Sequence, residues 1–495
     1  MNNILEYLER NIDLMPDKTA LAINSETLSF SDLVIKSRKL ASTIGKTNND
    51  NGIAVFVNRG INTVILFMAA IYSGSFYIPI DPNMPVKKIQ SIIYDANPTV
   101  ILGENFNNEL INALDFDGKF ITLDDSSNEL CELPEFDENS PLYMVYTSGS
   151  TGKPKGVLKT HKAMISFVET YVNTFDFSSD DIIGNQTPLF FDASAKDIYL
   201  MLKTGATLEI IPTEKFAMPT TLIEYMNDKR ITFISWVPTA FSLVAQLRTF
   251  SFIMPLYLKK AFFVGEVMPM KTLNYWRKFL PDVKYVNLYG QSELAGVSCY
   301  YEVIDKFEND ATLPMGKTFS NCEIFLIDQG QVITEANHIG EMYIASDALA
   351  SKYYNDAEKT KVSFVFKDFG NGVKRLLKTG DLAYYNDDGL LLFASRTDFQ
   401  IKHLGHRIEL GEIETIAGAL DDLQACCCLY NEKRQQITLF CEIIKESEIT
   451  HAEIKSILKK KLSSYMVPEK VIILDAMPIN ANGKINRQYL KELLK

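Results

Sequence analysis

Short apolar runs alternate with amphipathic stretches along the first hundred residues. Between the runs, helical spacing of apolar positions predicts a helix that is capped by Ser31 or Asp32 and reaches Ile44, and further helices over 61–73 and 87–96. The apolar runs themselves predict strands at 27–30, 53–57, 76–80 and 99–101. Alternation of this kind predicts a parallel sheet that is covered by helices.

The same pattern continues downstream with longer gaps. Residues 160–171 have helical spacing, whereas the polar stretch 105–139 is poorly periodic and predicts surface loops. Further strands are predicted at 142–146, 231–235, 261–264 and 285–288. Ligands of open α/β sheets bind beyond the carboxyl ends of the strands. We therefore expect the last three strand ends to share one cleft with the polar loop at 147–156.

The pattern changes again in the last quarter of the chain. Residues 340–344 begin a β region, and a smaller α+β segment follows residue 398. Its helices are predicted at 410–420 and 452–462, and its strands at 437–444 and 471–474. Periodicity thus predicts an α/β body followed by a smaller α+β domain.

Composition and charge narrow the class of protein. The 495 residues are 46% apolar and 23% charged, as in soluble globular proteins of two to four structural units. A formal net charge of −12 argues against a nucleic-acid partner and against docking on an anionic membrane. An acidic protein partner would therefore have to bind a local basic patch on the surface of this acidic chain. The longest apolar run, 64–72, is far shorter than the roughly 20 residues of a membrane span, and no signal peptide is visible.

Cysteine and histidine usage indicates the compartment. The seven cysteines include three in a row, Cys426, Cys427 and Cys428, and form no CxxC motif. We interpret them as reduced, buried thiols of a cytoplasmic protein. Neighbouring cysteines in a strand-like run point to opposite faces, and the five histidines are scattered, so the sequence favours neither a zinc site nor a disulfide framework.

The loop at 147–156 carries the strongest chemical signal. It reads TSGSTGKPKG and follows the apolar run 142–146. Backbone N–H groups, hydroxyl donors and lysine charges suit a polyphosphate. The spacing does not fit a Walker A loop, because Lys153 is followed by Pro154, which disfavours a helix. By itself the string is also compatible with a flexible polar surface loop.

This string resembles the phosphate loop of the adenylate-forming superfamily: acyl-CoA synthetases, luciferases and the adenylation domains of nonribosomal peptide synthetases. Other motifs of the family occur in family order before and after this loop, and the resemblance covers nearly the whole chain. They lie at 72–82, 287–293, 378–381, 395–414 and 478–487. The resemblance implies a large adenylation core domain over 1–394, a hinge over 395–398 with Asp398 as its pivot, and a small mobile C-terminal domain over 399–495.

The resemblance also implies a site for ATP and Mg²⁺. Tyr289 would lie flat on the adenine, and Asp381 would accept hydrogen bonds from the ribose hydroxyls. Glu293 would hold the Mg²⁺. The residues implied to bind ATP are Thr147, Ser148, Gly149, Ser150, Thr151, Gly152, Lys153, Lys155, Asn287, Tyr289, Gly290, Ser292, Asp381, Phe393 and Arg396. The chain departs from the family strings at Gln291-Ser292, where Pro-Thr is usual, and at Ser395, where glycine is common.

Two lysines would serve the two steps of the reaction that the resemblance implies. In the first step a carboxylate attacks the α-phosphate of ATP, and an acyl adenylate and pyrophosphate result. Lys484 would bridge the substrate carboxylate and the α-phosphate. The small domain would then rotate about Asp398, so that Lys402 serves the transfer of the acyl group to a thiol.

The substrate pocket is predicted around Asp192. This aspartate matches the position at which family members that activate α-amino acids hold the substrate ammonium. The aligned pocket residues are Ala193, Lys196, Ser235, Phe262, Val264, Leu288, Gly296 and Val297. A lysine in a mostly apolar pocket favours an anion, so we expect an acidic side chain, with glutamate first. The alternative is that Lys196 points to solvent.

Three other functions stay open at this point. A D-alanine–carrier protein ligase would require a small pocket, and Lys196 fits such a pocket poorly. Asp192 argues against an acyl-CoA synthetase. A non-catalytic nucleotide-binding protein should have lost Lys484 or Glu293, and both are present. The resemblance implies a phosphopantetheinylated carrier protein as partner. We expect that carrier to be a discrete protein, because no carrier motif follows residue 484, and we expect the enzyme to be a monomer.

Overall fold

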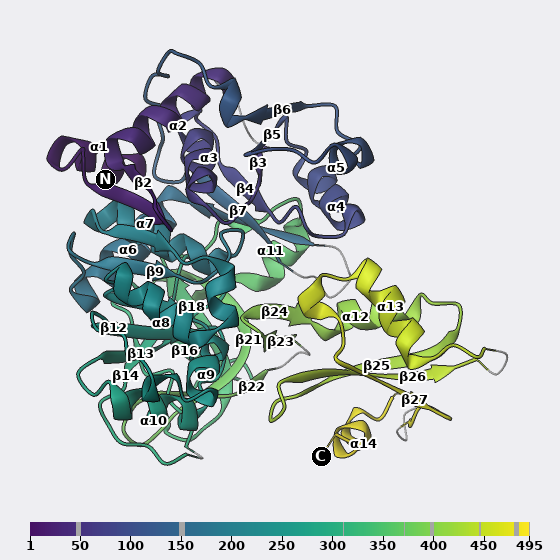
Figure 1. Cartoon of the computed structure of the whole chain (residues 1–495). Helices are drawn as coiled ribbons and strands as arrows, with labels where there is room; N and C mark the ends of the chain where they lie inside the picture. The colour runs from purple at the N-terminus through teal and green to yellow at the C-terminus, as the bar shows by residue number, and fades with distance from the viewer. Residues whose placement is uncertain are drawn as a thin grey trace. The chain divides into compact units, whose positions relative to one another are not determined.

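The chain divides into two compact units in this computed structural model (Figure 1). The large unit comprises Met1–Pro82, Ile93–Val145 and Gly156–Thr397, and the small unit comprises Asn83–Ile92, Tyr146–Lys155 and Asp398–Lys495. The structure describes residues 1–45, 51–147, 154–309, 311–370, 372–396, 400–444, 447–479 and 485–494. The predicted boundaries at 394 and 398 stay a prediction, and the proposed pivot Asp398 lies outside the described residues.

A nine-stranded sheet forms one layer of the large unit. Its order is β15-β14-β13-β12-β11-β9-β10-β1-β2, and the six strands from β13 to β1 are all parallel. This confirms the expected parallel sheet and the predicted strands at 231–235, 261–264 and 285–288. The strands are β1 (Thr19–Ile23), β2 (Glu26–Ser29), β9 (Ile182–Asn185), β10 (Thr207–Ile210), β11 (Phe233–Trp236), β12 (Lys260–Val264), β13 (Lys284–Tyr289), β14 (Cys299–Glu302) and β15 (Lys317–Thr318).

A second sheet has seven strands in the order β19-β8-β7-β4-β3-β5-β6. They are β3 (Ile53–Phe56), β4 (Tyr77–Ile80), β5 (Val100–Gly103), β6 (Lys119–Thr122), β7 (Pro141–Thr147), β8 (Lys155–Thr160) and β19 (Lys352–Tyr353). The sequence pattern missed β8, because a lysine stands at each end of its apolar stretch. Burial nevertheless covers β8 from Gly156 to Thr160.

The large unit contains helices that the sequence predicted, Phe30–Ile44, Ile61–Tyr72 and His161–Phe175, and others that it did not. The helices include α1 (Leu5–Leu14), α2 (Phe30–Ile44), α3 (Ile61–Tyr72), α6 (His161–Phe175), α7 (Asp192–Thr204), α8 (Pro219–Asp228), α9 (Pro238–Gln246), α10 (Met270–Phe279) and α11 (Ala357–Ser363), and the helix predicted at 87–96 is α4 (Val86–Ala96). The predicted cap of α2 is wrong. Ser29 is the N-cap, and its hydroxyl accepts a hydrogen bond from the backbone N–H of Asp32 at 3.0 Å. The buried Phe30 is already the first helical residue.

The prediction of surface loops over 105–139 is wrong for part of this stretch. It contains α5 (Asn108–Ala113), β6 and a short 3₁₀ turn at Leu123–Asp125. β6 pairs in parallel with β5 and buries Ile121, while Phe120 packs edge-on against Phe106 and Phe116. An edge strand with few apolar residues gives only a weak alternating pattern.

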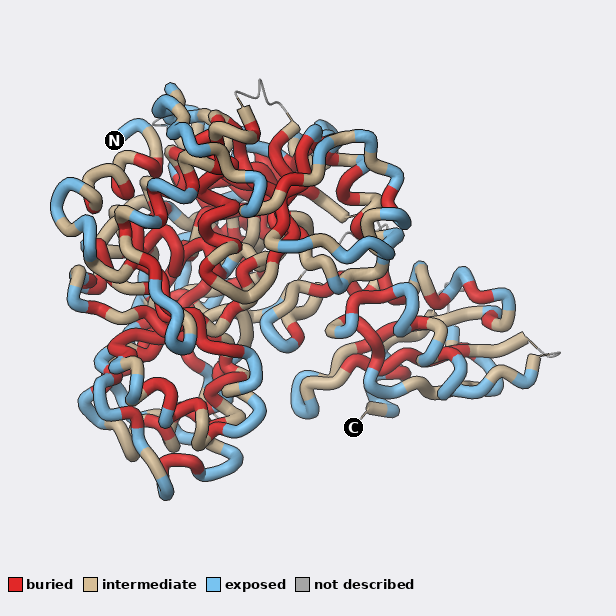
Figure 2. Tube along the Cα trace, turned by 45° about the horizontal axis from the view of Figure 1, so that its top comes forward, coloured by how far each residue is buried: buried red, intermediate tan, exposed pale blue. Residues whose placement is uncertain are grey.

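The two faces of the nine-stranded sheet belong to two different cores. Figure 2 shows in red the buried residues along the chain. Phe262 and Leu288 pack into the core that also holds α6, α7 and buried residues of the seven-stranded sheet. The alternate residues Ala261 and Phe263 pack into a second core with α8, α9 and α10. The helices α6 and α7 therefore lie between the two sheets.

An antiparallel β region and the small unit complete the fold. The β region has the order β17-β16-β18-β21-β20 with β22 beside β21. It confirms that residues after 340 form a β region, but the region begins earlier, at Cys322. Its strands are β16 (Cys322–Asp328), β17 (Gln331–Val332), β18 (Gly340–Ser346), β20 (Phe364–Asp368), β21 (Val373–Tyr385) and β22 (Leu391–Arg396). None of the helices in the described ranges is long and apolar enough to cross a membrane.

The small unit has the predicted α+β composition. Its elements include β23 (Gln400–His403), β24 (His406–Glu409), α12 (Leu410–Gly418), β25 (Leu423–Asn431), β26 (Gln436–Ile443), α13 (His451–Lys461), β27 (Lys470–Leu474) and α14 (Arg487–Glu492). The three consecutive cysteines lie in β25, and all seven thiols of the chain are free. The prediction of buried thiols is wrong for Cys131 and Cys426, which are half-buried, and is confirmed for Cys299, Cys322, Cys427, Cys428 and Cys441.

Candidate functional site

The register of β11, β12 and β13 brings predicted pocket residues onto one face of the nine-stranded sheet. Ser235 is the neighbour of Phe262, and Val264 is the neighbour of Leu288. Because side chains alternate along a strand, Phe262 and Val264 share a face, and Ser235 and Leu288 share it with them. This is the face that α6 and α7 cover, and Val264 and Leu288 lie near the carboxyl ends of their strands.

Gly296 closes this part of the pocket in the connection between β13 and β14. Its φ of +78° lies in the left-handed region, and a Cβ atom there would come within 2.3 Å of the ring of Phe167 on α6. The next residue, Val297, is buried. The structure thus brings Gly296 and Val297 to the end of β13, beside the face that holds Leu288.

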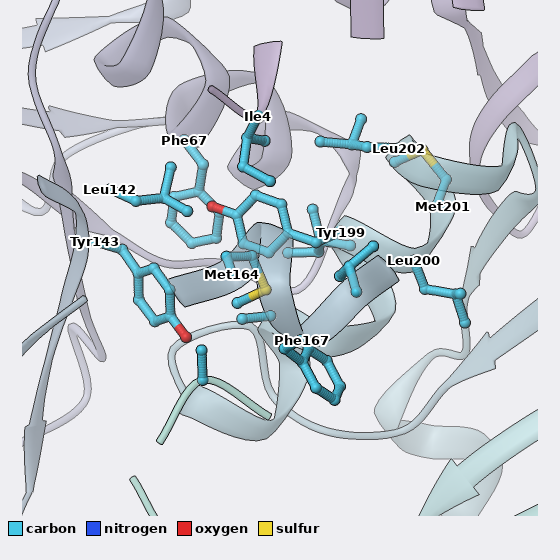
Figure 3. Close-up of a cluster of buried hydrophobic side chains, with 14 of the residues drawn as sticks. Ile4, Phe67, Leu142, Tyr143, Met164, Phe167, Tyr199, Leu200, Met201 and Leu202 are labelled. Carbon is cyan, nitrogen blue, oxygen red and sulfur yellow. The ribbon is translucent and has the colours of Figure 1, made fainter. Parts of the chain in front are cut away.

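Helix α7 connects the two sheets. Its Lys196 donates a hydrogen bond from Nζ to the backbone oxygen of Ser235 on β11 at 3.4 Å, and its Tyr199 hydroxyl lies 3.1 Å from the hydroxyl of Tyr77 on β4. Figure 3 shows Tyr199 and Tyr143 among the packed side chains between the sheets. Because α7 follows the carboxyl end of β9, its N-terminus lies at the sheet edge where ligands bind in such folds.

Lys196 is buried, and so the alternative that it points to solvent is wrong. The side chain is 4% exposed, and Nζ lies 2.6 Å from Oδ1 of Asp197, which is 1% exposed. The other oxygen of Asp197 accepts a hydrogen bond from Nδ2 of Asn185 at 3.0 Å. The positive charge of Lys196 therefore already has an anionic partner within the protein.

Asp192 is the first residue of α7 and carries a pair of contacts that the sequence did not indicate. Its Oδ1 accepts a hydrogen bond from the Tyr143 hydroxyl at 2.9 Å and forms an ion pair with Nζ of Lys159. Lys159 lies on β8, is fully buried, and places its ammonium over the ring of Tyr143. Burial lowers the pKa of Lys159, and the negative charge of Asp192 opposes that shift. In the sequence, the one hint that Lys159 pairs with a carboxylate is that this charged residue directly follows the apolar Val157 and Leu158.

Glu293, the predicted metal ligand, is 3% exposed and accepts a hydrogen bond from the Tyr353 hydroxyl at 2.5 Å. A buried carboxylate is the kind of oxygen ligand that Mg²⁺ prefers, and so the residue type fits. Its negative charge also acts to raise the pKa of Lys159. In the described ranges, no group of three or more His, Cys, Asp or Glu side chains is placed to hold a metal ion. A metal at Glu293 would therefore need oxygen atoms from ATP as further ligands.

Asp381 on β21 is the centre of a second polar network. The carboxylate is 2% exposed and accepts hydrogen bonds from the Tyr289 hydroxyl and from Nε2 of Gln291, the latter at 2.5 Å. Arg396 on β22 forms an ion pair with its other oxygen. Burial and the Asp381 charge raise the pKa of Tyr289, so that this hydroxyl stays protonated as a donor. Gln291 was visible in the sequence only as a departure from the family string.

The other predicted nucleotide residues lie on the same elements. Asn287 on β13 donates a hydrogen bond from Nδ2 to the backbone oxygen of Pro314 at 2.8 Å, and Phe393 on β22 is 38% exposed. At Gly290 a Cβ atom would come within 2.5 Å of the backbone oxygen of Gly296. Ser292, half-buried, follows the network residue Gln291. The ends of β13 and β22 and the interior of β21 thus gather Tyr289, Arg396 and Asp381 at one place, with an acceptor and a cation that suit a ribose and phosphates.

Several predicted residues cannot be placed in this network. Thr147 ends β7, Lys155 begins β8, and Lys402 lies on β23 of the small unit. The exposed Ala193 follows Asp192 on α7. The predicted residues Ser148, Gly149, Ser150, Thr151, Gly152, Lys153, Asp398 and Lys484 lie outside the described residues.

Comparison with known proteins assigns the family. The model of the AMP-binding enzyme family matches residues 8–354, and that of the AMP-binding enzyme C-terminal domain matches residues 412–484. The first match alone covers more than half of the chain. The chain belongs to the AMP-binding enzyme family. Membership confirms the resemblance to the adenylate-forming superfamily and the predicted class, an AMP-forming ligase.

Relatives of this AMP-binding enzyme include two synthases. It is 30% identical over 507 residues to zwittermicin A synthase ZmaJ of Bacillus cereus, and the match covers 98% of this chain and 94% of ZmaJ. It is 28% identical over 497 residues to tyrocidine synthase 1 of Brevibacillus parabrevis, with 99% of this chain covered. The chain spans 45% of the length of tyrocidine synthase 1.

A solved structure shows the same fold. The holo form of PA1221, described as a nonribosomal peptide synthetase protein that contains adenylation and PCP domains, superposes with a TM-score of 0.87. The sequences are 21% identical, and the match covers 99% of this chain and 84% of PA1221. This similarity confirms the predicted fold class, a large α/β domain with a small α+β domain.

Proposed function

We propose that this AMP-binding enzyme activates an α-amino acid with ATP and transfers it to the phosphopantetheine thiol of a separate carrier protein. The observation that carries the proposal is the position of Asp192. Its carboxylate stands at the N-terminus of α7, at the edge of the sheet where ligands bind, and is partly exposed. A carboxylate in this position suits the ammonium group of an amino acid.

The activation step follows from the two polar networks. A carboxylate oxygen of the amino acid forms a bond to the α-phosphorus of ATP, while the bond to pyrophosphate breaks and the pyrophosphate leaves. Asp381 and Arg396 are suited to the ribose and phosphates, and Tyr289 to the adenine face. We propose that Glu293 contacts the Mg²⁺ that accompanies ATP.

The two proposed catalytic lysines and the proposed pivot complete this account. Lys484 would neutralise charge between the substrate carboxylate and the α-phosphate, and Lys402 would serve the attack of the carrier thiol. Asp398 would be the residue about which the small domain turns between the two steps. The free thiols of the chain are compatible with the cytoplasmic location that we propose. We also propose that the enzyme is a monomer.

For the side chain of the amino acid we propose an acidic group, with glutamate as the first candidate. Lys196 supports this proposal because it is a buried cation on α7, four residues after Asp192, and so lies on the same face of the helix. An incoming carboxylate would share Nζ of Lys196 with Asp197. This carboxylate would have to displace part of an existing ion pair.

The same ion pair favours a second candidate. Because Asp197 neutralises Lys196, the pocket has no net charge from this pair and could also hold a small uncharged side chain. A D-alanine–carrier protein ligase would have such a substrate. L-glutamate and D-alanine differ in the side chain and in the configuration at the α-carbon, and both candidates use the same two steps.

Amino-acid-dependent exchange of pyrophosphate into ATP tests the proposal. The panel contains the proteinogenic amino acids, D-alanine and aryl acids. Exchange that is strongest with glutamate supports the first candidate, and exchange that is strongest with D-alanine supports the second. Exchange with aryl acids alone, or with no compound of the panel, contradicts the proposed function.

The variant Lys196→Met tests the role of Lys196 in the choice of side chain. If Lys196 contacts an acidic side chain, the variant should lose its preference for glutamate over glutamine. Lys260→Met is a matched control, because Lys260 also forms an ion pair with a buried aspartate, Asp181, at 3.2 Å. An unchanged preference in Lys196→Met would leave the reaction intact and remove the acidic side chain from the proposal.

A further inference from the structure

The ion pair between Lys159 and Asp192 changes what the substrate meets in the pocket. Asp192 is the residue to which we assign the α-substituent of the substrate, so this inference rests on the proposed function. The Lys159 side chain is fully buried, whereas the Asp192 side chain retains 19% exposure. The substrate can therefore reach the aspartate, and the lysine stays behind it.

The two oxygens of Asp192 have different surroundings. Both described partners, Tyr143 and Lys159, contact Oδ1. In the part of the chain that the structure describes, Oδ2 has no partner. The carboxylate is thus held from the β7 and β8 side through one oxygen, and the other oxygen can accept a hydrogen bond from a ligand.

The charge of Lys159 weakens the attraction of Asp192 for a second cation. A substrate ammonium at Oδ2 would stand about 3 Å from the oxygen and about 5 Å from the lysine nitrogen. Coulomb energy falls with the reciprocal of distance, and so the repulsion cancels roughly half of the attraction. A neutral hydroxyl donor loses almost nothing, because it carries no net charge.

The remaining groups near the pair do not restore the lost attraction. Glu293 is anionic and acts on Lys159, but it accepts a hydrogen bond from Tyr353 and is the residue that we assign to Mg²⁺. The second charged pair of α7, Lys196 with Asp197, is neutral as a whole. The preference for ammonium over hydroxyl therefore depends mainly on Asp192 and Lys159.

We propose that Lys159 is a specificity-determining residue that makes this enzyme accept 2-hydroxy acids beside the corresponding 2-amino acids. The group at the α-carbon then needs only one hydrogen to donate to Oδ2 of Asp192. The chemical step is the same for both classes. A carboxylate oxygen bonds to the α-phosphorus, pyrophosphate leaves with the electron pair of the broken bond, and the α-hydroxyl or α-amine is not changed.

The wild-type enzyme tests this directly through matched pairs of acids. The pairs are L-glutamate with L-2-hydroxyglutarate, D-alanine with D-lactate, L-alanine with L-lactate and L-leucine with L-2-hydroxyisocaproate. The decisive pair is the one whose amino acid supports the fastest pyrophosphate exchange. For this pair we expect kcat/KM of the hydroxy acid to lie within about 30-fold of kcat/KM of the amino acid. This factor is close to the difference in strength between charged and neutral hydrogen bonds. A larger preference for the amino acid overturns the inference and leaves the proposed function standing. Exchange with no acid of either class overturns both.

A variant of Lys159 tests the cause. Lys159→Met removes the charge at similar length, and the preference for amine over hydroxyl should rise about tenfold or more, because Asp192 then acts alone. Lys159→Arg restores the charge and should restore the wild-type ratio. Lys260→Met, which removes a lysine from another ion pair of the large unit, should leave the ratio unchanged.

The ratio of kcat/KM for the amino acid to kcat/KM for the hydroxy acid of a pair is a readout that a purely structural role of Lys159 would not change. Loss of packing lowers kcat/KM for both acids of a pair together, and only the charge of Lys159 separates them. An unchanged ratio in folded Lys159→Met overturns the role of this residue. If Lys159→Met does not fold, the ratio measured on the wild-type enzyme decides the inference alone.

Discussion

The ammonium of Lys159 on β8 and the carboxylate of Asp192 on α7 form an ion pair between the two sheets of the large unit, in which Lys159 is fully buried and Asp192 is partly exposed. The pair joins the seven-stranded sheet to the helix that begins the substrate pocket. The Tyr143 hydroxyl on β7 contacts the same oxygen of Asp192. A residue assigned to substrate binding is therefore also bound to two strands of the seven-stranded sheet.

This pair should show strong energetic coupling. Asp192→Asn leaves the buried charge of Lys159 without its partner and should lower the free energy of unfolding by about 3–5 kcal/mol. Lys159→Met leaves the partly exposed carboxylate of Asp192 and should lower it by less. The double variant should lose clearly less than the sum, because neither charge remains. Urea unfolding of the four proteins in a double-mutant cycle measures the coupling. Additive losses would contradict the ion pair.

Gln291 should support ATP binding through Asp381. Its Nε2 donates to the Asp381 carboxylate at 2.5 Å and lies 2.9 Å from the Tyr289 hydroxyl. Gln291→Leu removes this donor, and we expect KM for ATP to rise about tenfold, a loss of about 1.4 kcal/mol, while KM for the amino acid stays the same.

The matched control for this prediction is Gln331→Leu, because Gln331 is exposed on the short strand β17. Initial rates at varied ATP and at varied amino acid separate the two constants. An equal rise of both KM values in Gln291→Leu would show that the glutamine supports the fold in general, rather than the nucleotide site.

His161 should make the large unit sensitive to acid. Burial lowers the pKa of this histidine to about 3, and its Nδ1 accepts a hydrogen bond from the backbone N–H of Ile4 at 3.1 Å. The unfolded chain binds a proton at this residue below pH 6.5, whereas the folded chain does not until pH falls to about 3. Its contribution to stability is therefore complete above about pH 6.5 and is lost as pH falls toward 3.

Between pH 7.5 and pH 5.5 this single group should lower the free energy of unfolding by about 1.4 kcal/mol. His161→Asn keeps a side-chain acceptor for Ile4 and does not titrate in this range. The variant should lose about that much less stability than the wild-type protein between the two pH values, as measured by urea unfolding. Identical losses in both proteins would assign the acid sensitivity to other groups.

The elements that the sequence predicted well are those with a strong local pattern. The strands β11, β12 and β13 combine apolar runs with polar residues at their ends, and the pocket residues Ser235 and Phe262 fall into register as neighbours. By contrast, β6 was missed, because an edge strand with one buried residue has little periodicity. Local pattern alone also gave the wrong cap for α2, where Ser29 rather than Ser31 or Asp32 accepts the capping bond.

The partners of the site residues could not be predicted from sequence, because they come from distant segments. Lys159 and Asp192 are 33 residues apart, and Gln291 and Asp381 are 90 residues apart. Their contacts depend on which strands become neighbours and on which face of each strand is buried. Family motifs indicate Asp192 and Asp381 one at a time, whereas only the packed structure shows that Lys159 and Gln291 occupy oxygens of these two carboxylates.

In the reaction that we propose, a carboxylate oxygen of an amino acid attacks the α-phosphate of ATP. Glutamate labelled with ¹⁸O in its α-carboxylate, ATP and hydroxylamine as acceptor test it in a single reaction, read by mass spectrometry of the nucleotide. We expect AMP that carries one labelled oxygen, and a parallel reaction with labelled D-alanine covers the second candidate. Unlabelled AMP, or ADP in place of AMP, from both substrates would contradict this proposal.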